Sequence, residues 1–358
     1  MDYFEKNGIR NIGFDLQKSA ISEFKVLWKN YTKKIKPYPG KFSGRGIVTC
    51  AGGIRYFTCA WIMIKTLRKN GCTLPVELWY LGNELTNEAI NEISKYNVVC
   101  KNILNYGPCS LTGYMLKPLA IIKSSFKEIL FLDADNVCIR NPEELFDAEE
   151  YAKYGTIFWP DFWETSPKNP IWKITNSVST NSKEQESGQI LINKERCWKE
   201  LNLCLHFNRL HIYYYKLLLG DKDTFRFAWI ALKTPFYMID IEPAVCGYLD
   251  NTNIFCGNTM IQHNLKKEFY FLHRNLVKWD VTKSEKRVWK IIKRFNSDAQ
   301  SKEYFFTVSN GKYFMDIKGD VEELNFCDFL PDYECMCIEF LEELRTSQFY
   351  DRFITSLR

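Results

Sequence analysis

The sequence lacks any apolar run long enough to cross a bilayer. Its apolar stretches, such as residues 60–64 and 129–132, are far shorter than the roughly 20 residues that a membrane-spanning helix needs. The N-terminal stretch is polar and carries an acidic residue at position 2, unlike a secretory signal peptide. We therefore expect no membrane span in this chain and a location in the cytoplasm.

The sequence also lacks blocks of like charge, low-complexity tracts and internal repeats. Its 48 basic and 43 acidic residues are mixed along the chain and leave a net charge of +5, so no nucleic acid is expected as a partner. A G-x-G-x-x-G fingerprint is missing too, which gives no support for a nicotinamide cofactor. The 13 cysteines are odd in number and irregularly spaced, and this favours a reducing compartment over a disulfide framework.

What is present is enough apolar material for a large core, since 46% of the 358 residues are hydrophobic and 16% are aromatic. Between residues 46 and 132, short β-rich segments alternate with segments of helical spacing. This alternation predicts an α/β fold with a mixed, mainly parallel sheet flanked by helices. The predicted strands are residues 46–53, 76–82, 98–104 and 129–132, and the predicted helices are residues 56–71, 86–97 and 113–126.

Three segments are predicted along the chain. They are an N-terminal helical lead-in (1–43), an α/β domain (44–280) and a C-terminal extension of helix, hairpin and helix (281–358). The lead-in carries one predicted helix, near residues 19–29, and ends in a stretch rich in proline and glycine.

Local patterns predict further elements in the second half of the chain. The polar, turn-rich residues 167–185 predict a mobile loop over the functional edge of the sheet. In the extension, we expect a basic helix at residues 283–295, a hairpin turning at Asn310-Gly311 and an amphipathic helix from Glu334 to the end.

Two carboxylates stand at the end of one predicted strand. Residues 129–132 lead directly into Asp133 and Asp135, and a turn is expected at Asn136. Ligands of open α/β sheets bind beyond the carboxyl ends of the strands, so this pair lies where a ligand is expected. Two hard oxygen donors suit Mg²⁺ or Mn²⁺, with substrate phosphates completing the shell. The alternative is that both side chains cap the next turn through main-chain N–H groups.

The segment ILFLDADNVCIRNPEELF resembles the DxD segment of nucleotide-sugar glycosyltransferases of the GT-A fold. ESGQILINKERCW, GDKDTFRFAW and FLHRNLVKW follow in the order that retaining members show. With GRGIVTCAGGIRYF and NGCTLPVELWYLG upstream, the sequence of these segments is most similar to that of the fungal-type Mnn α-mannosyltransferases, over about residues 44–280. The chain departs from these proteins by lacking an N-terminal anchor. Family members usually work in the secretory pathway, so the Golgi lumen is the alternative location if an anchor has been removed.

The resemblance implies a metal site. Asp135 would bind Mn²⁺ (or Mg²⁺) directly, Asp133 would meet the metal or the donor's ribose, and His273 would supply the third protein ligand. His263, ten residues earlier, is the competing imidazole.

The resemblance also implies a donor site. Lys278 would neutralise charge on the departing diphosphate, although related glycogenin-like enzymes have Lys-Pro-Trp where this chain has Lys278 directly before Trp279. Its alternative is a solvated surface lysine. The other predicted donor-binding residues, each of which could instead serve packing or lie in solvent, are Gly52, Arg55, Tyr56 and Lys117.

Three residues are predicted to act near the transferred sugar and the acceptor. Asp223 and Glu186 are the chosen acids, and Gln189 would hydrogen-bond the donor sugar or face solvent. Asp221 is a third acid, which could cap the helix that follows it. The tryptophans at 159, 163 and 172 resemble a wall for stacking a sugar, with core packing as the alternative for Trp159.

The resemblance thus implies a metal-dependent, retaining α-mannosyltransferase that takes mannose from GDP-mannose and extends a glycan or glycoprotein. Within the same class, the alternative is a UDP-sugar-dependent, glycogenin-like transferase. From another class, the alternative is a non-catalytic carbohydrate-binding protein. The intact DxD pair, His273 and Lys278 speak against that last alternative.

Overall fold

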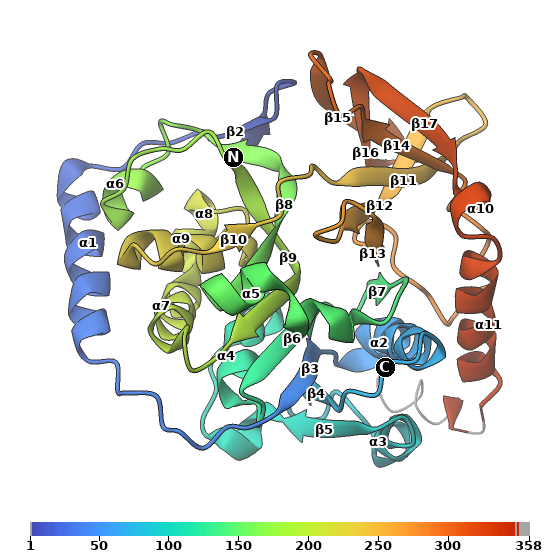
Figure 1. Ribbon diagram of the computed structural model, residues 1–358, viewed down its shortest axis with the longest axis horizontal. Coiled ribbons are helices and arrows are strands. Elements are labelled where there is room, and N and C mark those ends of the chain that lie inside the picture. Colours follow the sequence, from blue (N-terminus) through green and yellow to red (C-terminus); the bar gives the residue numbers. More distant parts are fainter. Residues whose placement is uncertain (1, 348, 351–358) are drawn as a thin grey trace. The chain divides into compact units, whose positions relative to one another are not determined.

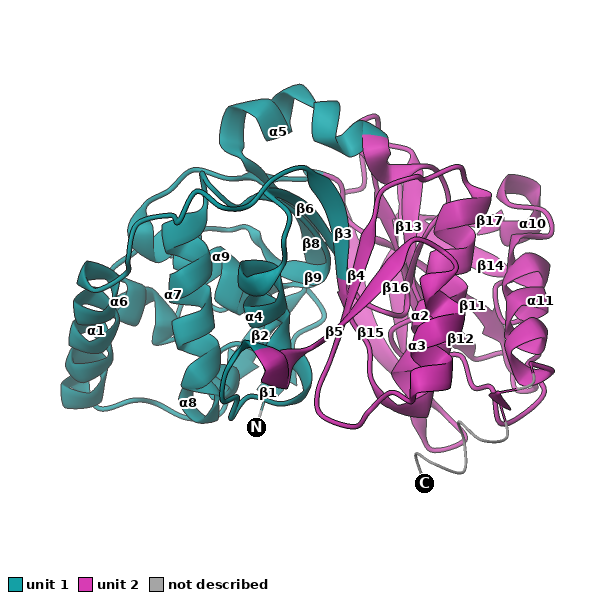
Figure 2. Ribbon diagram, turned by 90° about the horizontal axis from the view of Figure 1, so that it is seen from below, with its two compact units in different colours: residues 1–48, 106–132, 144–240 teal, residues 49–105, 133–143, 241–358 magenta. Residues whose placement is uncertain are grey.

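The chain divides into two compact units in the computed structural model, which describes residues 2–347, 349 and 350 (Figure 2). Each unit is assembled from three separate stretches of chain. Unit 1 comprises Met1–Val48, Tyr106–Leu132 and Glu144–Asp240, and unit 2 comprises Thr49–Asn105, Asp133–Glu143 and Ile241–Arg358. These boundaries differ from the predicted segments 1–43, 44–280 and 281–358, and that division stays a prediction.

Unit 1 is built on a mixed sheet whose strands run in the order β1-β2-β8-β9-β6-β3, with β10 beside β8 (Figure 1). Strand β6 lies inside this sheet because its apolar residues Ile129 to Leu132 are fully buried. It pairs in parallel with β3 and antiparallel with β9. The strands are β1 (Asp2–Phe4), β2 (Ile9–Ile12), β3 (Arg45–Cys50, of which the first four residues belong to this unit), β6 (Glu128–Leu132), β8 (Thr156–Thr165), β9 (Lys183–Asn193) and β10 (Tyr237–Met238).

Helices pack on this sheet and on one another. Helix α9 packs against β9, α7 lies against both α9 and α4, and α1 packs against α6 and α7. The helices are α1 (Lys18–Lys33), α4 (Leu116–Lys123), α5 (Glu149–Tyr154), α6 (Ile171–Thr175), α7 (Trp198–Arg209), α8 (His211–Leu217) and α9 (Lys222–Leu232), with 3₁₀ turns η2 (Gly113–Met115) and η3 (Pro142–Asp147).

Unit 2 contains the parallel strand pair β4 and β5 with helices α2 and α3, and an eight-stranded antiparallel sheet. In that sheet β7 pairs with β13, β13 with β12, and β12 with both β11 and the hairpin β15–β16. Strands β14 and β17 continue from β11. The strands are β4 (Val76–Tyr80), β5 (Val98–Asn102), β7 (Asn136–Cys138), β11 (Ala244–Leu249), β12 (Phe255–His263), β13 (Phe269–His273), β14 (Ile291–Phe295), β15 (Lys302–Ser309), β16 (Lys312–Gly319) and β17 (Val321–Asn325).

The helices of unit 2 cover its strands. Helix α2 packs against β7 and against α11, and α3 packs against β5. Eight successive residues of α2, Phe57 to Ile64, are almost fully buried, because partners lie on more than one of its faces. The helices are α2 (Gly53–Lys69), α3 (Asn87–Ser94), α10 (Phe326–Phe329) and α11 (Tyr333–Arg345), with the 3₁₀ turn η1 (Ile103–Tyr106).

The predicted α/β class with a mixed sheet is confirmed, as are the elements predicted between residues 46 and 132 and the hairpin at Asn310-Gly311. Among the described residues, no helix is both long and apolar enough to cross a bilayer.

Several sequence predictions are wrong. Residues 283–290 are irregular and 291–295 form strand β14, because these residues pair with β11 and β17 instead of closing a helix. Residues 167–185 are not one loop, since they contain α6 and the start of β9. The lead-in contains two strands that were not predicted, β1 and β2. Helix α11 ends at Arg345, and the end of the predicted C-terminal helix lies outside the described residues.

Candidate active site

The turn after β6 carries the two aspartates of the DxD segment. Strand β6 ends at Leu132, and the Asn136 N–H donates to the carbonyl oxygen of Asp133 at 3.0 Å, which closes the expected turn. Strand β7 then pairs antiparallel with β13 so that Asn136 lies opposite His273. This register, rather than proximity in the sequence, brings His273 of the segment FLHRNLVKW to the aspartates.

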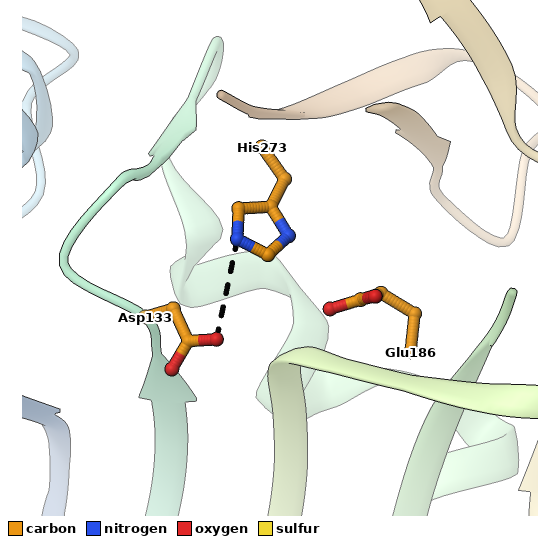
Figure 3. Close-up of side chains that lie close together, drawn as sticks. All are labelled: Asp133, Glu186 and His273. Carbon is orange, nitrogen blue, oxygen red and sulfur yellow. Dashed lines mark ion pairs between the residues drawn. The ribbon is translucent and has the colours of Figure 1, made fainter. Parts of the chain in front are cut away.

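His273 lies close to both carboxylates, and Figure 3 shows its pairing with Asp133. Its Nε2 atom lies 3.3 Å from Oδ1 of Asp135 and 4.0 Å from Oδ2 of Asp133. Lys278 forms an ion pair with the other oxygen of Asp135. Burial alone would raise the pKa of the buried Asp135 carboxyl, but His273 and Lys278 lower it well below its usual range. Asp135 is therefore held as an anion and shares its charge with two basic side chains.

The donor set of Asp133, Asp135 and His273 matches the chemistry of a divalent cation. The imidazole Nε2 atom of His273 lies within 4.0 Å of one carboxylate oxygen of Asp133 and of one carboxylate oxygen of Asp135. An imidazole among hard oxygen donors suits Mn²⁺ better than Ca²⁺. The side chain of Asp133 is about a quarter exposed, whereas that of Asp135 is almost fully buried. The residues therefore fit the metal that the sequence predicted, and their role as ligands stays a prediction.

Arg274 is a residue of this region that the sequence interpretation missed. Its main-chain N–H donates to the carbonyl oxygen of Asp135 at 3.0 Å, and its guanidinium pairs with Glu285 at 2.9 Å. The guanidinium also lies 3.7 Å from the centre of the Trp279 ring, and the side chain is 1% exposed. Arg274 thus fixes the chain between His273 and Lys278. The available signal was its place directly after the histidine in FLHRNLVKW.

We expect Arg274→Lys to weaken Mn²⁺ binding about tenfold or more, because the lysine keeps the charge but loses the planar fork that fixes the residues next to His273. The measurement is a Mn²⁺ titration of the purified variant by electron paramagnetic resonance. Lys283→Gln is the control, since the Lys283–Asp280 pair is exposed and should matter little. A loss of thermal stability with unchanged Mn²⁺ affinity would contradict the positioning role.

The predicted donor-binding residues of unit 2 lie around the start of α2. Lys278 places its Nζ atom 5.6 Å from the centre of the Tyr56 ring, so these two predicted residues come together. Arg55 lines the same cavity as Lys278. Gly52 has a local reason to be glycine, because a Cβ atom there would lie 2.0 Å from a carboxylate oxygen of Glu84. Close approach of a nucleotide to Gly52 stays a prediction.

Lys117 of unit 1 is not an exposed helix lysine. It is 3% exposed, and its Nζ atom contacts the Ser187 hydroxyl at 2.8 Å and the Asp221 carboxylate at 3.1 Å. Asp221 makes no side-chain cap on α9. Burial and these partners give Lys117 a structural role inside unit 1, and its predicted contact with the donor is untested.

The acids chosen from the sequence differ in their surroundings within unit 1. Asp223 is fully buried, and its carboxylate accepts from the Arg226 guanidinium at 2.7 Å and the Gln185 N–H at 3.0 Å. Glu186, also drawn in Figure 3, lies on β9 and is 8% exposed. Gln189 is fully buried on the same strand, so the alternative that it faces solvent is wrong.

A buried ionic network surrounds Asp223, and the sequence did not predict it. Lys222 contacts Asp161 at 2.7 Å and Glu184 at 2.5 Å, and Glu184 also pairs with Arg10 at 2.7 Å. Burial raises the pKa of Asp161 to about 6, with Lys222 opposing and Glu186 adding to the shift. No local pattern joins the residue Arg10 to a strand more than 170 positions later.

The competing imidazole of His263 and the three tryptophans of the predicted stacking wall are all buried. Burial, with a smaller contribution from Arg294, lowers the pKa of His263 to about 4, and its ring lies 5.2 Å from that of Phe269. The interpretation of the tryptophans as a stacking wall is wrong, since all three are core residues. Trp159, Trp163 and Trp172 are 0%, 4% and 3% exposed.

Comparison with known proteins places this chain in a family. The model of the family described as "Mannosyltransferase putative" matches residues 44–185 and 173–264, more than half of the chain. This chain belongs to that mannosyltransferase family. The match ends before β13, so His273, Arg274 and Lys278 lie beyond it.

Individual relatives agree with this assignment. The alpha-1,2-mannosyltransferase MNN2 of Saccharomyces cerevisiae is 29% identical over 311 residues, covering 71% of this chain and 52% of MNN2. MNN5 of the same species is 30% identical over 294 residues, covering 64% and 50%. The chain spans about half the length of these curated relatives. Among solved structures, the glycosyltransferase GlyE of Streptococcus pneumoniae has a TM-score of 0.38 and 13% identity, covering 55% of this chain and 46% of GlyE.

Proposed function

We propose that this member of the mannosyltransferase family is a metal-dependent, retaining α-mannosyltransferase of the GT-A type, which transfers mannose from GDP-mannose to a hydroxyl of a glycan. The observation that carries the proposal is the group formed by Asp133, Asp135 and His273 with Lys278 beside it. Such a group is suited to holding a cation and a diphosphate together. The names of the relatives favour an α-1,2 linkage.

In the proposed reaction, the bond between mannose C1 and the diphosphate oxygen breaks, and a bond from C1 to the acceptor oxygen forms on the same face. Asp133, Asp135 and His273 would hold Mn²⁺, which when bound supplies charge stabilisation for the departing diphosphate. Lys278 would donate a hydrogen bond to a phosphate oxygen of the leaving group.

The transfer has two proposed routes. In a front-face route the acceptor oxygen bonds to C1 as the diphosphate leaves, and the acceptor proton passes to the leaving phosphate oxygen. In a double displacement a carboxylate first bonds to C1 and releases the diphosphate; the acceptor oxygen then displaces that carboxylate, and its proton passes to a phosphate oxygen of the bound diphosphate. Glu186 and Asp223 are the proposed acids for this route. Glu186 has a larger exposed fraction than the fully buried Asp223, which favours Glu186 as the carboxylate that bonds to C1. Gln189 is proposed to hydrogen-bond the donor sugar.

A donor screen tests the proposal. We expect release of GDP from GDP-mannose in the presence of Mn²⁺ and a mannoside acceptor, loss of that release with a chelator, and no comparable turnover of UDP-sugars. The α-mannoside product would be identified by nuclear magnetic resonance. Turnover of a UDP-sugar instead would overturn the donor but keep the class. Binding of glycans without turnover of any donor would favour a carbohydrate-binding protein.

A further inference from the structure

A cavity of about 870 Å³ lies within unit 2. Three separate segments line it: the start of α2, the chain from Arg274 to Val288, and residues Lys312 and Tyr313 at the tip of the β15–β16 hairpin. Its volume is that of a ligand-binding pocket. Two of these three segments follow residue 264, so this part of the wall lies beyond the family match.

The cavity carries an excess of positive charge. Arg55, Lys286 and Lys312 line it, are exposed, and make no ion pair among the residues that the structure describes. Three further lining cations are already neutralised by ion pairs: Lys278 by Asp135, Lys283 by Asp280 and Arg274 by Glu285. Unbalanced cations around a concave surface attract an anionic ligand.

The lining also offers an aromatic surface. Tyr313 is 67% exposed and follows Lys312 directly. An exposed aromatic ring suits the apolar face of a sugar, and lysines suit a phosphate. The cavity therefore combines the two groups needed to bind a phosphorylated sugar.

We propose that this cavity binds a phosphate group carried by the glycan acceptor, with Lys286 and Lys312 contacting the phosphate and Tyr313 the sugar ring. The proposal rests on the proposed function, because it assigns the donor diphosphate to Lys278 and the metal ligands. Lys286 and Lys312, on the two C-terminal segments of the lining, are then not needed for the donor diphosphate and are available to bind a second anion.

The test is a titration with mannose 6-phosphate, mannose and inorganic phosphate, followed by nuclear magnetic resonance. We expect mannose 6-phosphate to bind at least about tenfold more tightly than mannose, and K286Q/K312Q to remove that preference. Tyr313→Ala should weaken the binding of mannose 6-phosphate but not the binding of inorganic phosphate. The control is K290Q/K318Q, because Lys290 and Lys318 are exposed but do not line the cavity. Raising the salt concentration should weaken the lysine-dependent binding.

GDP binding with Mn²⁺ separates this inference from the proposed function. We expect K286Q/K312Q to change it less than about twofold. Loss of GDP affinity in that variant, with mannose 6-phosphate unaffected, would assign the cavity to the donor and overturn the inference. Equal binding of mannose and mannose 6-phosphate by the wild type would overturn it as well. Failure of the proposed function would show separately, as absence of GDP-mannose turnover in the wild type.

Discussion

Asp135→Asn should reduce Mn²⁺-dependent transfer from GDP-mannose by about a thousandfold or more, since the reaction would lose a charged metal ligand. Asp135 is the centre of its group, because His273 and Lys278 both pair with it. Asparagine keeps the size of the side chain but cannot supply the negative charge. The measurements are kcat/KM for GDP-mannose and the Mn²⁺ dissociation constant.

Two controls make the result of Asp135→Asn specific. Asp298→Asn alters an exposed acid outside the group and should keep wild-type activity. Because Asp135→Asn removes the charged partner of the largely buried Lys278, circular dichroism and thermal unfolding are needed to verify that the variant is folded, and we expect that it is. A folded Asp135→Asn protein with undiminished transfer would exclude Asp135 as a metal ligand.

Glu184→Gln should lower the free energy of unfolding by about 3–5 kcal/mol, because breaking a buried ion pair leaves uncompensated buried charge. Glu184 is fully buried and contacts Arg10, Lys222 and the Thr165 hydroxyl at 2.7, 2.5 and 2.9 Å. Glutamine would leave the fully buried Arg10 without its closest carboxylate. Urea denaturation at pH 7 measures the difference.

The control for Glu184→Gln is Glu164→Gln. Glu164 pairs with Lys183 at 3.4 Å, and its side chain is 29% exposed. A partly exposed pair contributes at most about 1 kcal/mol. Equal losses in the two variants would show that the network around Glu184 contributes no more than a surface pair.

Lowering the pH should reduce the difference in the free energy of unfolding between the wild type and Glu184→Gln. Burial would raise the pKa of Glu184, but Lys222 and Arg10 lower it well below its ordinary value of 4.5. A carboxyl whose pKa is lowered on folding stabilises the protein above its unfolded pKa, and this contribution is lost as the pH falls through the lowered value. We therefore expect the gap between the two proteins to be full above about pH 4.5 and to shrink below it. A gap that does not change with pH would show that the loss comes from packing alone.

Much of the fold between residues 46 and 132 could be predicted, because local signals suffice there. Apolar strands such as 129–132 and helices of regular spacing appear in the order that the structure has them. The turn at Asp133 and Asn136 and the hairpin at Asn310-Gly311 are also local, since turn residues set the backbone conformation within a few positions. Asp133 and Asp135 could be selected for the same reason.

Local sequence patterns were enough to predict the alternation of strands and helices, the carboxylate pair at a strand end and the resemblance to mannosyltransferases. Contacts between distant parts of the chain make residues 291–295 a strand, bury Trp159 in the core and pair Arg10 with Glu184. They also place His273, through the pairing of β13 with β7. Such β pairing and buried ion pairs join residues far apart in the chain, and no pattern of neighbouring residues encodes those partners.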